Sequence, residues 1–266
     1  MIMEALQNLS EAEADEVMDE WRQEGIASVK IEQADHLWTV MTIASPEATG
    51  SDDSVRKPDE HDPELGTLSE RFESNGEPGA VGRDKKGGYS YGQYQIATRP
   101  GTMKVFLEFL YKVDPDAFTR LNDAGGLTDA MDGTDAFKSA WKDLAKDLSR
   151  NPSFGGVQHA FIQATHYEPF VNRLAGMNLM VNERSNALKN VVWSTAVQHG
   201  PGNTVFKNAL DGRNPANMND AEIIEAVYDE RSKVELYFSG SDAGVKKALL
   251  VRFRHERSEA LKMLPS

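Results

Sequence analysis

The sequence predicts a mainly α-helical, α+β fold, and three observations lead to this prediction. Apolar residues recur at helical spacing over most of the chain beyond residue 102. A glycine-rich and tyrosine-rich stretch at residues 76–96 disfavours helix and is typical of turns and short strands. Two β-rich runs lie before residue 45. We therefore expect a small αββ module at residues 1–45, a linker at 46–66 and one larger domain at 67–266.

The αββ module is expected to begin with a helix over residues 10–25. Ser10 and Glu13 form a capping box, and Gly25 closes the apolar helical pattern. Residues 26–31 and 37–43 follow as two expected strands. So small a unit buries little surface by itself, and we expect it to dock on the larger domain, a second copy or a partner. Residues 46–66 are rich in Pro, Ser, Asp and Glu, which favours a linker.

A short helix at the start of the larger domain presents the first candidate for catalysis. Thr67 and Glu70 form a capping box, and Gly76 offers a helix stop. Glu73 then falls in the last turn, beside Phe72. The helix dipole and the apolar neighbour both disfavour an ionised carboxylate there, so we expect a raised pKa. A carboxyl group that stays protonated near neutral pH suits a general acid that protonates a glycosidic oxygen.

A second carboxyl group follows in the glycine-rich loop. Asp84 lies among Arg83, Lys85 and Lys86, whose positive charges should keep it ionised. The two acids are therefore expected to differ in protonation. One Glu and one Asp eleven residues apart also occur by chance in a chain that is 27% charged, so the pair alone does not establish a catalytic site.

An aromatic and amide-rich segment follows Asp84 and is expected to be extended up to Tyr94. Rings and hydrogen-bonding side chains alternate along it, which suits a sugar-binding surface. Its members are Tyr89, Ser90, Tyr91, Gln93, Tyr94 and Gln95. For Tyr91 and Tyr94, a place in the core of a small sheet is an equally good interpretation.

The remainder of the larger domain is expected to be helical. Helices are expected to begin at Thr102, Pro115, Thr134, Ser153, Asn186, Asn219 and Asp242. Gly125 and Gly126 should end the helix that begins at Pro115. The third of these helices should bury Phe137, Trp141, Leu144 and Leu148. Residues 186–199 are apolar on most sides, so this helix is expected to be central and buried. The last helix should turn Arg252, Arg254 and Arg257 outward.

The composition excludes several functional classes. With no cysteine, the chain has neither disulfides nor a thiol nucleophile. The net charge of -13 argues against nucleic acid binding. The six histidines show no metal-binding spacing, no phosphate-binding fingerprint is present, and we expect neither metal nor cofactor. No apolar run approaches the ~20 residues that span a bilayer, and MIMEALQNLSEAEADE lacks the features of a Sec signal peptide.

The order of these residues resembles the chitosanase-like lysozyme domains of type VI secretion spike proteins and effectors, and of some phage lysins. The pattern E-S-x-G, a glycine-rich loop and D-x-x-G-G-x-S-Y-G-x-Y-Q carries the resemblance. FIQATHYEPF at residues 161–170 and VVWSTAVQHGPG at 191–202 extend it, from about residue 65 to the C-terminus. The resemblance implies a bilobal, lysozyme-like helical domain with a small β/loop lobe, which cleaves glycan strands.

The resemblance also assigns catalytic roles. Glu73 matches the general acid, Asp84 the base that activates water, and Ser90 a hydroxyl that helps to hold that water. The loop between the two acids is shorter than in the pattern, and an additional residue separates Asp84 from the Ser-Tyr-Gly, so Glu77 is an alternative second carboxylate. Carboxyl groups ~6.5 to 9.5 Å apart would invert the anomeric centre, and groups ~5 to 5.5 Å apart would retain it. We expect inversion.

The expected substrate contacts complete the site. On general grounds His166 and His199 are more often structural histidines, but the resemblance places both segments beside the cleft. The full set of expected contacts is Glu77, Tyr89, Tyr91, Gln93, Tyr94, Gln95, His166, Tyr167, Gln198 and His199.

The sequence thus predicts a glycoside hydrolase that cleaves the β-1,4 glycan strand of peptidoglycan, as an antibacterial effector or a phage-associated lysin. A lytic transglycosylase, a chitosanase and a non-catalytic glycan-binding component of a phage or secretion assembly are the alternatives. The expected partners are glycan strands, an immunity protein or a component of a delivery machine. We expect synthesis in the cytoplasm and action on the cell wall.

Overall fold

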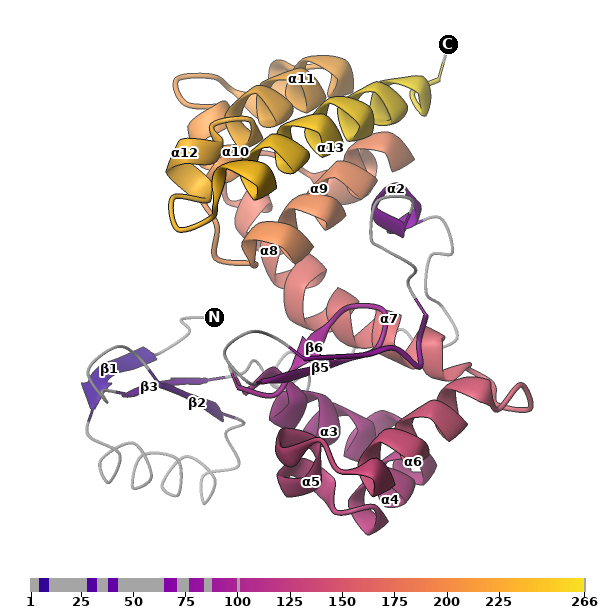
Figure 1. The fold of residues 1–266 in the computed structure, drawn as a ribbon. Helices are drawn as coiled ribbons and strands as arrows, with labels where there is room; N and C mark the ends of the chain where they lie inside the picture. The colour runs from indigo at the N-terminus through magenta and orange to yellow at the C-terminus, as the bar shows by residue number, and fades with distance from the viewer. Residues whose placement is uncertain are drawn as a thin grey trace, which may run out of the picture. The chain divides into compact units, whose positions relative to one another are not determined.

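A computed structural model describes residues 5–9, 28–32, 38–42, 65–70, 77–83, 88–99 and 101–265, and most of these residues are helical. The chain forms two compact units (Figure 1). The first contains residues 1–60 and 79–150, and the second contains residues 61–78 and 151–266. The chain therefore enters the second unit before it builds most of the first.

The N-terminal module contains a three-stranded antiparallel sheet. Its strands are β1 (Ala5–Leu9), β2 (Ser28–Glu32) and β3 (Trp38–Thr42), in the order β1-β3-β2. The two predicted strands are confirmed as β2 and β3, whereas β1 was not predicted. The predicted helix over residues 10–25 and most of the predicted linker lie outside the described residues. Leu65 and Gly66, at the end of that linker, are buried in the second unit.

A second antiparallel sheet in the first unit contains the aromatic segment. Its strands are β4 (Val81–Arg83), β5 (Tyr89–Tyr91) and β6 (Ile96–Ala97), in that order, with Gly82 opposite Ser90. The prediction that the segment stays extended up to Tyr94 is wrong, because the chain turns over residues 92–95. Gly92, with φ 75°, and Gln95, with φ 54°, adopt left-handed backbone angles that reverse the chain. The sequence Gly-Gln-Tyr-Gln is a weaker turn signal than Asn-Gly, so this turn was not predicted.

Among the described residues of the first unit, four helices follow this sheet: α3 (Thr102–Val113), α4 (Pro115–Asp123), α5 (Gly126–Asp132) and α6 (Asp135–Lys146). The predicted starts at Pro115 and Thr134 are confirmed. Helix α3 also begins at Thr102, but its N-cap is Gly101 without a side-chain bond, so the predicted Thr102 cap is wrong. Gly126, predicted as a stop, begins α5 directly. The prediction that Leu148 lies in the core is wrong. Because α6 ends at Lys146, Leu148 leaves the apolar face and is 97% exposed.

The core of the first unit joins the small sheet to these helices. The fully buried Tyr91 ring packs against Phe137 at 5.3 Å and Trp141 at 5.2 Å between ring centroids. Its hydroxyl donates a hydrogen bond to the Ala130 carbonyl at 3.0 Å. Burial, with a smaller contribution from Tyr89, raises the pKa of Tyr91 to about 12.

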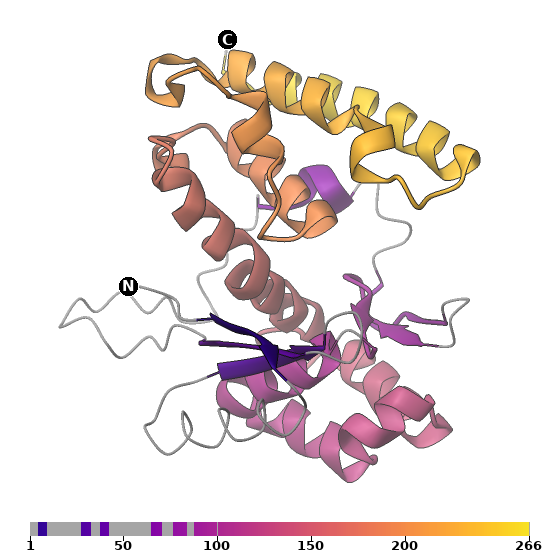
Figure 2. The same cartoon turned by 90° about the vertical axis from the view of Figure 1, so that its left-hand side faces the viewer.

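The second unit is built around a buried central helix (Figures 1 and 2). Its elements are α2 (Thr67–Glu70), α7 (Phe154–Ile162), η3 (Gln163–Tyr167), α8 (Glu168–Ala175), η4 (Val181–Glu183), α9 (Asn186–His199), α10 (Val205–Ala209), η5 (Pro215–Asn217), α11 (Asp220–Arg231), α12 (Val234–Tyr237) and α13 (Ala243–Lys262). The predicted central helix is confirmed as α9, which is buried over most of its length. The predicted capping box of Asn219 and Glu222 is also present.

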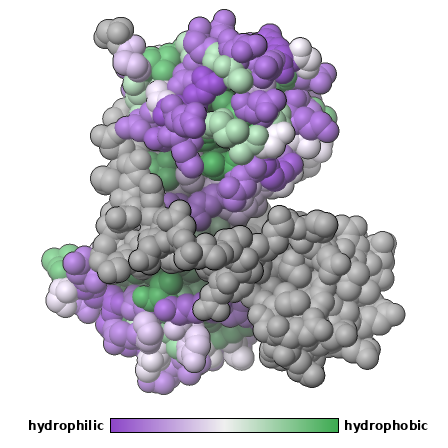
Figure 3. Space-filling model, turned by 180° about the vertical axis from the view of Figure 1, so that it is seen from behind, coloured by the Kyte–Doolittle hydropathy of each residue, from purple (hydrophilic) through white to green (hydrophobic). Residues whose placement is uncertain are grey.

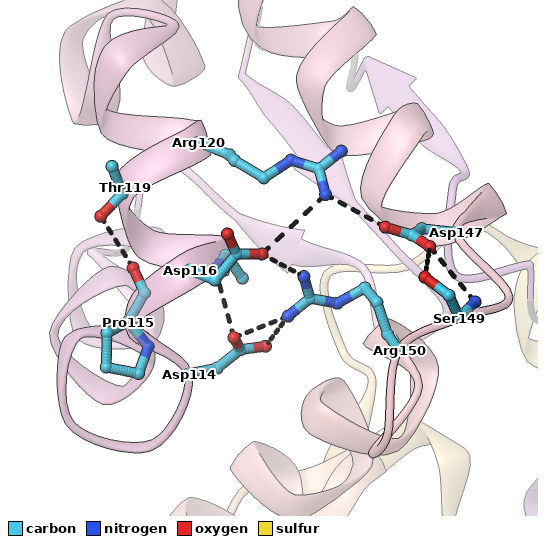
Figure 4. A network of polar contacts seen from close by, with 9 residues as sticks. Asp114, Pro115, Asp116, Thr119, Arg120, Asp147, Ser149 and Arg150 are labelled. Atoms are coloured by element: carbon cyan, nitrogen blue, oxygen red, sulfur yellow. Dashed lines mark hydrogen bonds and ion pairs between the residues drawn. The ribbon is translucent and has the colours of Figure 1, made fainter.

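A network of arginines and aspartates ties α4 to the end of the first unit (Figure 4). The guanidinium of Arg150 binds both carboxylate oxygens of Asp114, at 2.6 and 2.5 Å, and one of Asp116 at 2.5 Å. Arg120 contacts Asp147 at 3.3 Å. The Asp114 carboxylate also accepts the Ala117 N–H, so one side chain caps α4 and holds Arg150.

A second, buried network joins α9, α11 and α13. Arg231 and Glu256 are both fully buried, with 3.2 Å between Nη1 and Oε2. Arg252 donates to the other Glu256 oxygen at 2.6 Å, and Ser194 and Tyr228 donate hydroxyl hydrogen bonds to Oε2 at 3.0 and 3.1 Å. Arg252 was predicted to point outward, but it takes part in this buried network. Arg257, by contrast, pairs with the exposed side chains of Glu225 and Asp229, in agreement with its predicted outward position.

The described surface is mixed in character. Among the described residues on the face drawn in Figure 3, most are hydrophilic, and the apolar ones lie in small separate areas. Within the described part of the chain, no helix combines the length and hydropathy that crossing a membrane requires.

Candidate functional site

The two predicted catalytic acids, Glu73 and Asp84, lie outside the described residues. The structure does describe the chain on either side of each acid. Residues 65–70 and 77–78 flank Glu73 in the second unit, and β4 and β5 flank Asp84 in the first. The candidate site is therefore built from these flanking residues and the side chains that hold them.

Asn190, inside the central helix α9, holds the chain that leads to Glu73. Its side-chain oxygen accepts hydrogen bonds from the backbone N–H groups of Gly66 at 2.9 Å and Leu68 at 3.3 Å. Its amide nitrogen donates to the Asn186 carbonyl at 3.0 Å, so the side chain is fixed from both ends. Asn190 is buried, and the two bonds therefore satisfy N–H groups that water does not reach.

Gly66 is required at this contact by both space and backbone angle. Its φ of 90° is one that residues with a Cβ rarely adopt. A Cβ there would lie 3.1 Å from the indole nitrogen of Trp193 and 3.3 Å from the His159 ring. The chain can thus approach α9 and α7 closely before α2 begins.

A second anchor holds the chain after Glu73. The fully buried Gln158 of α7 donates its amide N–H to the Pro78 carbonyl at 2.9 Å. The described chain before Glu73 is thus held by α9, and the described chain after it is held by α7 of the same unit. Glu77, the alternative second carboxylate, precedes the second anchor directly and is exposed.

An aromatic stack lies beneath the first anchor. The His159 and Trp193 rings are parallel, with centroids 4.5 Å apart and an interplanar angle of 14°. Tyr167 adds its ring at 5.7 Å from Trp193. These three side chains come from α7, α9 and η3, so the stack fixes the three elements to one another. We call Asn190, Gln158, His159, Trp193 and Tyr167 the anchor cluster.

The segment η3 is a π-helical turn within one continuous helical run from α7 to α8, which Figure 2 shows. Such turns carry one extra residue, re-aim the side chains on them and are frequent at functional sites. His166 lies in this turn, half-buried, with its Nδ1 atom 2.8 Å from the Thr165 hydroxyl. Burial lowers the pKa of His166 below its ordinary value.

In the first unit, Ser90 faces away from the tyrosine core. Its hydroxyl donates to the side-chain oxygen of Gln95 at 2.8 Å, while the Gln95 amide nitrogen approaches the Gly92 carbonyl at 3.5 Å. A Cβ on Gly82, the partner across the sheet, would lie 2.8 Å from the Ser90 hydroxyl. Glycine there leaves room for two of the predicted site residues, Ser90 and Gln95, to meet.

The tyrosines of the segment divide between surface and core. Tyr89 is half-buried, and the Lys138 ammonium lies 4.7 Å from its ring centroid. Gln93 and Tyr94 are half-buried in the turn between β5 and β6. Tyr91 is fully buried and so offers no surface to a sugar in this structure. Its predicted role as a substrate contact gives way to the core role that the sequence left open.

The end of α9 differs from its predicted role as an exposed mouth. The Gln198 side-chain oxygen accepts a hydrogen bond from Arg231 at 2.6 Å. The His199 ring lies among Tyr237, Phe238 and Phe253, at centroid distances of 5.5, 5.2 and 6.5 Å. Burial and then the charges of Arg231 and Arg252 lower the pKa of His199 to about 3. His199 is thus a neutral, packed side chain here, in line with the structural interpretation.

The predicted site residues divide between the two units. Ser90 and Gln95 come together in the first, and His166 and Tyr167 lie side by side in the second. The anchor cluster adds Asn190, Gln158, His159 and Trp193, which the sequence had not singled out. The polar Asn190 among the apolar positions of a predicted buried helix was the one available signal. Among the described residues, no group of three acidic, histidine or cysteine side chains could hold a metal ion.

Comparison with known proteins shows the family to which this chain belongs. The family described as "Type VI secretion system spike protein VgrG3-like, C-terminal" matches residues 65–257. The chain belongs to this family. The match contains every candidate site residue and all of the anchor cluster, and it leaves the N-terminal module outside.

A curated relative is the type VI secretion system spike protein VgrG3 of Vibrio cholerae serotype O1. It is 35% identical to this chain over 169 residues, which are 62% of this chain and 15% of that protein. The chain therefore matches only a small part of a much longer relative.

Two solved structures share the fold. One is the native chitosanase from Bacillus subtilis MY002, with a TM-score of 0.52, 22% identity, and coverage of 73% of this chain and 86% of that one. The other is a variant of the same enzyme complexed with 6 GlcN, with a TM-score of 0.51, 22% identity and the same coverage. The predicted chitosanase-like lysozyme fold is thus confirmed.

Proposed function

We propose that the protein is a muramidase that hydrolyses the β-1,4 glycan strand of peptidoglycan by general acid and base catalysis. The observation that carries this proposal is the anchoring of the described chain on both sides of Glu73, at residues 66–68 and at Pro78. Asn190 holds the chain before it and Gln158 holds the chain after it. Proton transfer to a glycosidic oxygen requires a closely positioned acid, because misplacement by about 1 Å lowers the rate of such reactions strongly, and the two anchors limit the movement of the described chain on either side of Glu73.

In the proposed mechanism Glu73 donates its proton to the oxygen of the leaving sugar. Asp84 accepts a proton from the water that attacks the anomeric carbon, and the Ser90 hydroxyl helps to orient this water. The donation from Ser90 to Gln95 supports this role, because it gives the hydroxyl oxygen a defined direction. Glu77 remains the alternative base. Attack by water from the side opposite the leaving group inverts the anomeric centre.

Family membership supports a place of action as well. We infer that the protein is made in the cytoplasm, is delivered by a type VI secretion machine and acts on the cell wall of a target cell. An immunity protein and a component of the delivery machine are its proposed partners.

Digestion of purified sacculi tests the activity. Glu73→Gln keeps the shape of the side chain and removes the proton donor, so we expect the release of reducing ends to fall by about 10²- to 10⁴-fold. Asp84→Asn should be comparably severe, whereas Glu108→Gln, an exposed change on α3, should leave the rate unchanged. Full activity of Glu73→Gln would refute the proposal. Loss with Glu77→Gln in place of Asp84→Asn would move the role of the base to Glu77.

A chitosanase is the second candidate, because a structure with the same fold is complexed with 6 GlcN. Parallel digestion of sacculi and chitosan, followed by mass spectrometry of the products, separates the two activities. The same spectra identify a lytic transglycosylase by its anhydro ends. Binding to sacculi without any new ends would indicate a glycan-binding component instead.

A further inference from the structure

His166 is held in one tautomer by the residue before it. The Thr165 hydroxyl is 2.7 Å from the Phe161 carbonyl and 2.8 Å from His166 Nδ1. A hydroxyl has one hydrogen, and a carbonyl oxygen can only accept. The Thr165 hydrogen therefore goes to Phe161, and its oxygen faces the imidazole as an acceptor. His166 Nδ1 must then carry the hydrogen that completes the second bond.

This tautomer leaves an acceptor at the other ring nitrogen. A neutral imidazole carries one N–H, so Nε2 presents a lone pair. Burial lowers the pKa of His166, which keeps the ring neutral near pH 7. Among the described residues, the hydrogen bonding of this ring involves Nδ1 alone, and no described side chain donates to Nε2.

The neighbours of His166 belong to the anchor cluster. The next residue, Tyr167, packs on Trp193, and Gly66 lies against the same indole. Gly66 begins the chain that leads to Glu73. A half-buried acceptor thus lies on a π-helical turn that is fixed to the support of the proposed acid.

We propose that His166 is a substrate-binding residue whose Nε2 accepts a hydrogen bond from the glycan, either from a sugar hydroxyl or from an acetamido N–H. Thr165 positions the ring, because its hydroxyl oxygen accepts a hydrogen bond from the Nδ1–H group. This inference rests on the proposed function for the identity of the glycan. It assigns His166 a polarity: the ring receives hydrogen bonds from the substrate and transfers no proton.

Binding to sacculi tests the contact without turnover. In the Glu73→Gln background, co-sedimentation with sacculi should weaken by roughly 2- to 10-fold when His166→Leu removes the acceptor, the range that one net hydrogen bond covers. His166→Gln should recover most of this loss, because its side-chain oxygen can take the place of Nε2. Ala164→Ser, an exposed change in the same turn, serves as the matched control and should bind unchanged.

A spectroscopic readout tests the tautomer independently of any activity. Nitrogen-15 NMR of the full chain at pH 7 should show His166 neutral and protonated at Nδ1, with the signal assigned by its loss in His166→Gln. Thr165→Val keeps the shape and removes the acceptor oxygen, so it should shift the ring toward the Nε2-protonated tautomer and weaken binding.

The outcomes separate the two proposals. A wild-type chain that binds sacculi and releases no new ends refutes the muramidase and leaves His166 open to the binding test. Equal binding of the Glu73→Gln chain with and without His166→Leu overturns the contact. An Nε2-protonated His166 in the wild-type chain overturns the assigned polarity.

Discussion

Each of the two units contains an arginine bound by carboxylates, but only one of these arginines is fully buried together with its partner. Arg231 and Glu256 are 0% exposed and join three helices of the second unit. Arg150 is 11% exposed and binds Asp114, which is 12% exposed, and Asp116, which is 68% exposed. A buried ion pair adds little net stability when both partners are present, yet losing one partner leaves an uncompensated charge. The same chemistry should therefore respond very differently to mutation in the two units.

The largest effect is expected at Glu256. Glu256→Gln removes the negative charge between Arg231 and Arg252, and we expect the free energy of unfolding to fall by about 3 to 5 kcal/mol in urea titrations. The double change Arg231→Met with Glu256→Leu should recover part of this loss, because it removes both fully buried charges and leaves only Arg252, which is 22% exposed. A loss below about 1 kcal/mol for Glu256→Gln would show that water reaches this network.

His199 extends the comparison to pH. Its pKa of about 3 lies below the ordinary 6.5, so the unfolded chain binds a proton in this range that the native chain does not. Stability should therefore fall as the pH drops from 6.5 toward 3, by about 1.4 kcal/mol per pH unit from this group. His199→Phe, which suits the surrounding rings, should remove that part of the slope between pH 6 and 4. An unchanged slope would contradict the burial of a neutral ring.

Asp114 should show a smaller effect. Asp114→Asn keeps an oxygen that can cap α4 and removes the charge that binds Arg150, so we expect a loss of about 1 kcal/mol. Asp114→Ala removes the cap as well and should lose about 1 kcal/mol more. Thermal unfolding of the two variants side by side separates the two roles. Equal losses would mean that the cap contributes nothing.

The smallest effect is expected at Arg120. Its pair with Asp147 joins side chains that are 36% and 31% exposed, and such pairs contribute little. Arg120→Ala should change the free energy of unfolding by no more than about 0.5 kcal/mol. A loss comparable to that of Glu256→Gln would remove the contrast between the two units.

The local features of the fold followed from the sequence. The caps at Thr134, Ser153 and Asn219 and the burial of α9 were all visible, because a cap or an apolar stripe depends on residues within a few positions of one another. The prediction that Leu148 is buried was wrong for a local reason, because α6 ends at Lys146, two residues before the end of its apolar pattern.

The features that build the site were less predictable because they depend on distant residues. Asn190 bonds to Gly66, 124 positions away, and Gln158 to Pro78, 80 positions away. The π-helical turn at η3 and the Arg231–Glu256 pair likewise have no short-range signature. The sequence could therefore indicate Glu73 as an acid, but among the side chains that hold the surrounding chain only Asn190, a polar residue in an apolar helix, left a signal.

The bonds from Asn190 also bear on how the protein is made. A chain synthesised from its N-terminus completes residues 66–78 long before Asn190 leaves the ribosome, and even Gln158 comes 80 positions after Pro78. Until then neither bond can form, and closing so long a loop must await the helices of the second unit. A nascent or prematurely truncated chain would thus lack both bonds that hold the described chain on either side of Glu73.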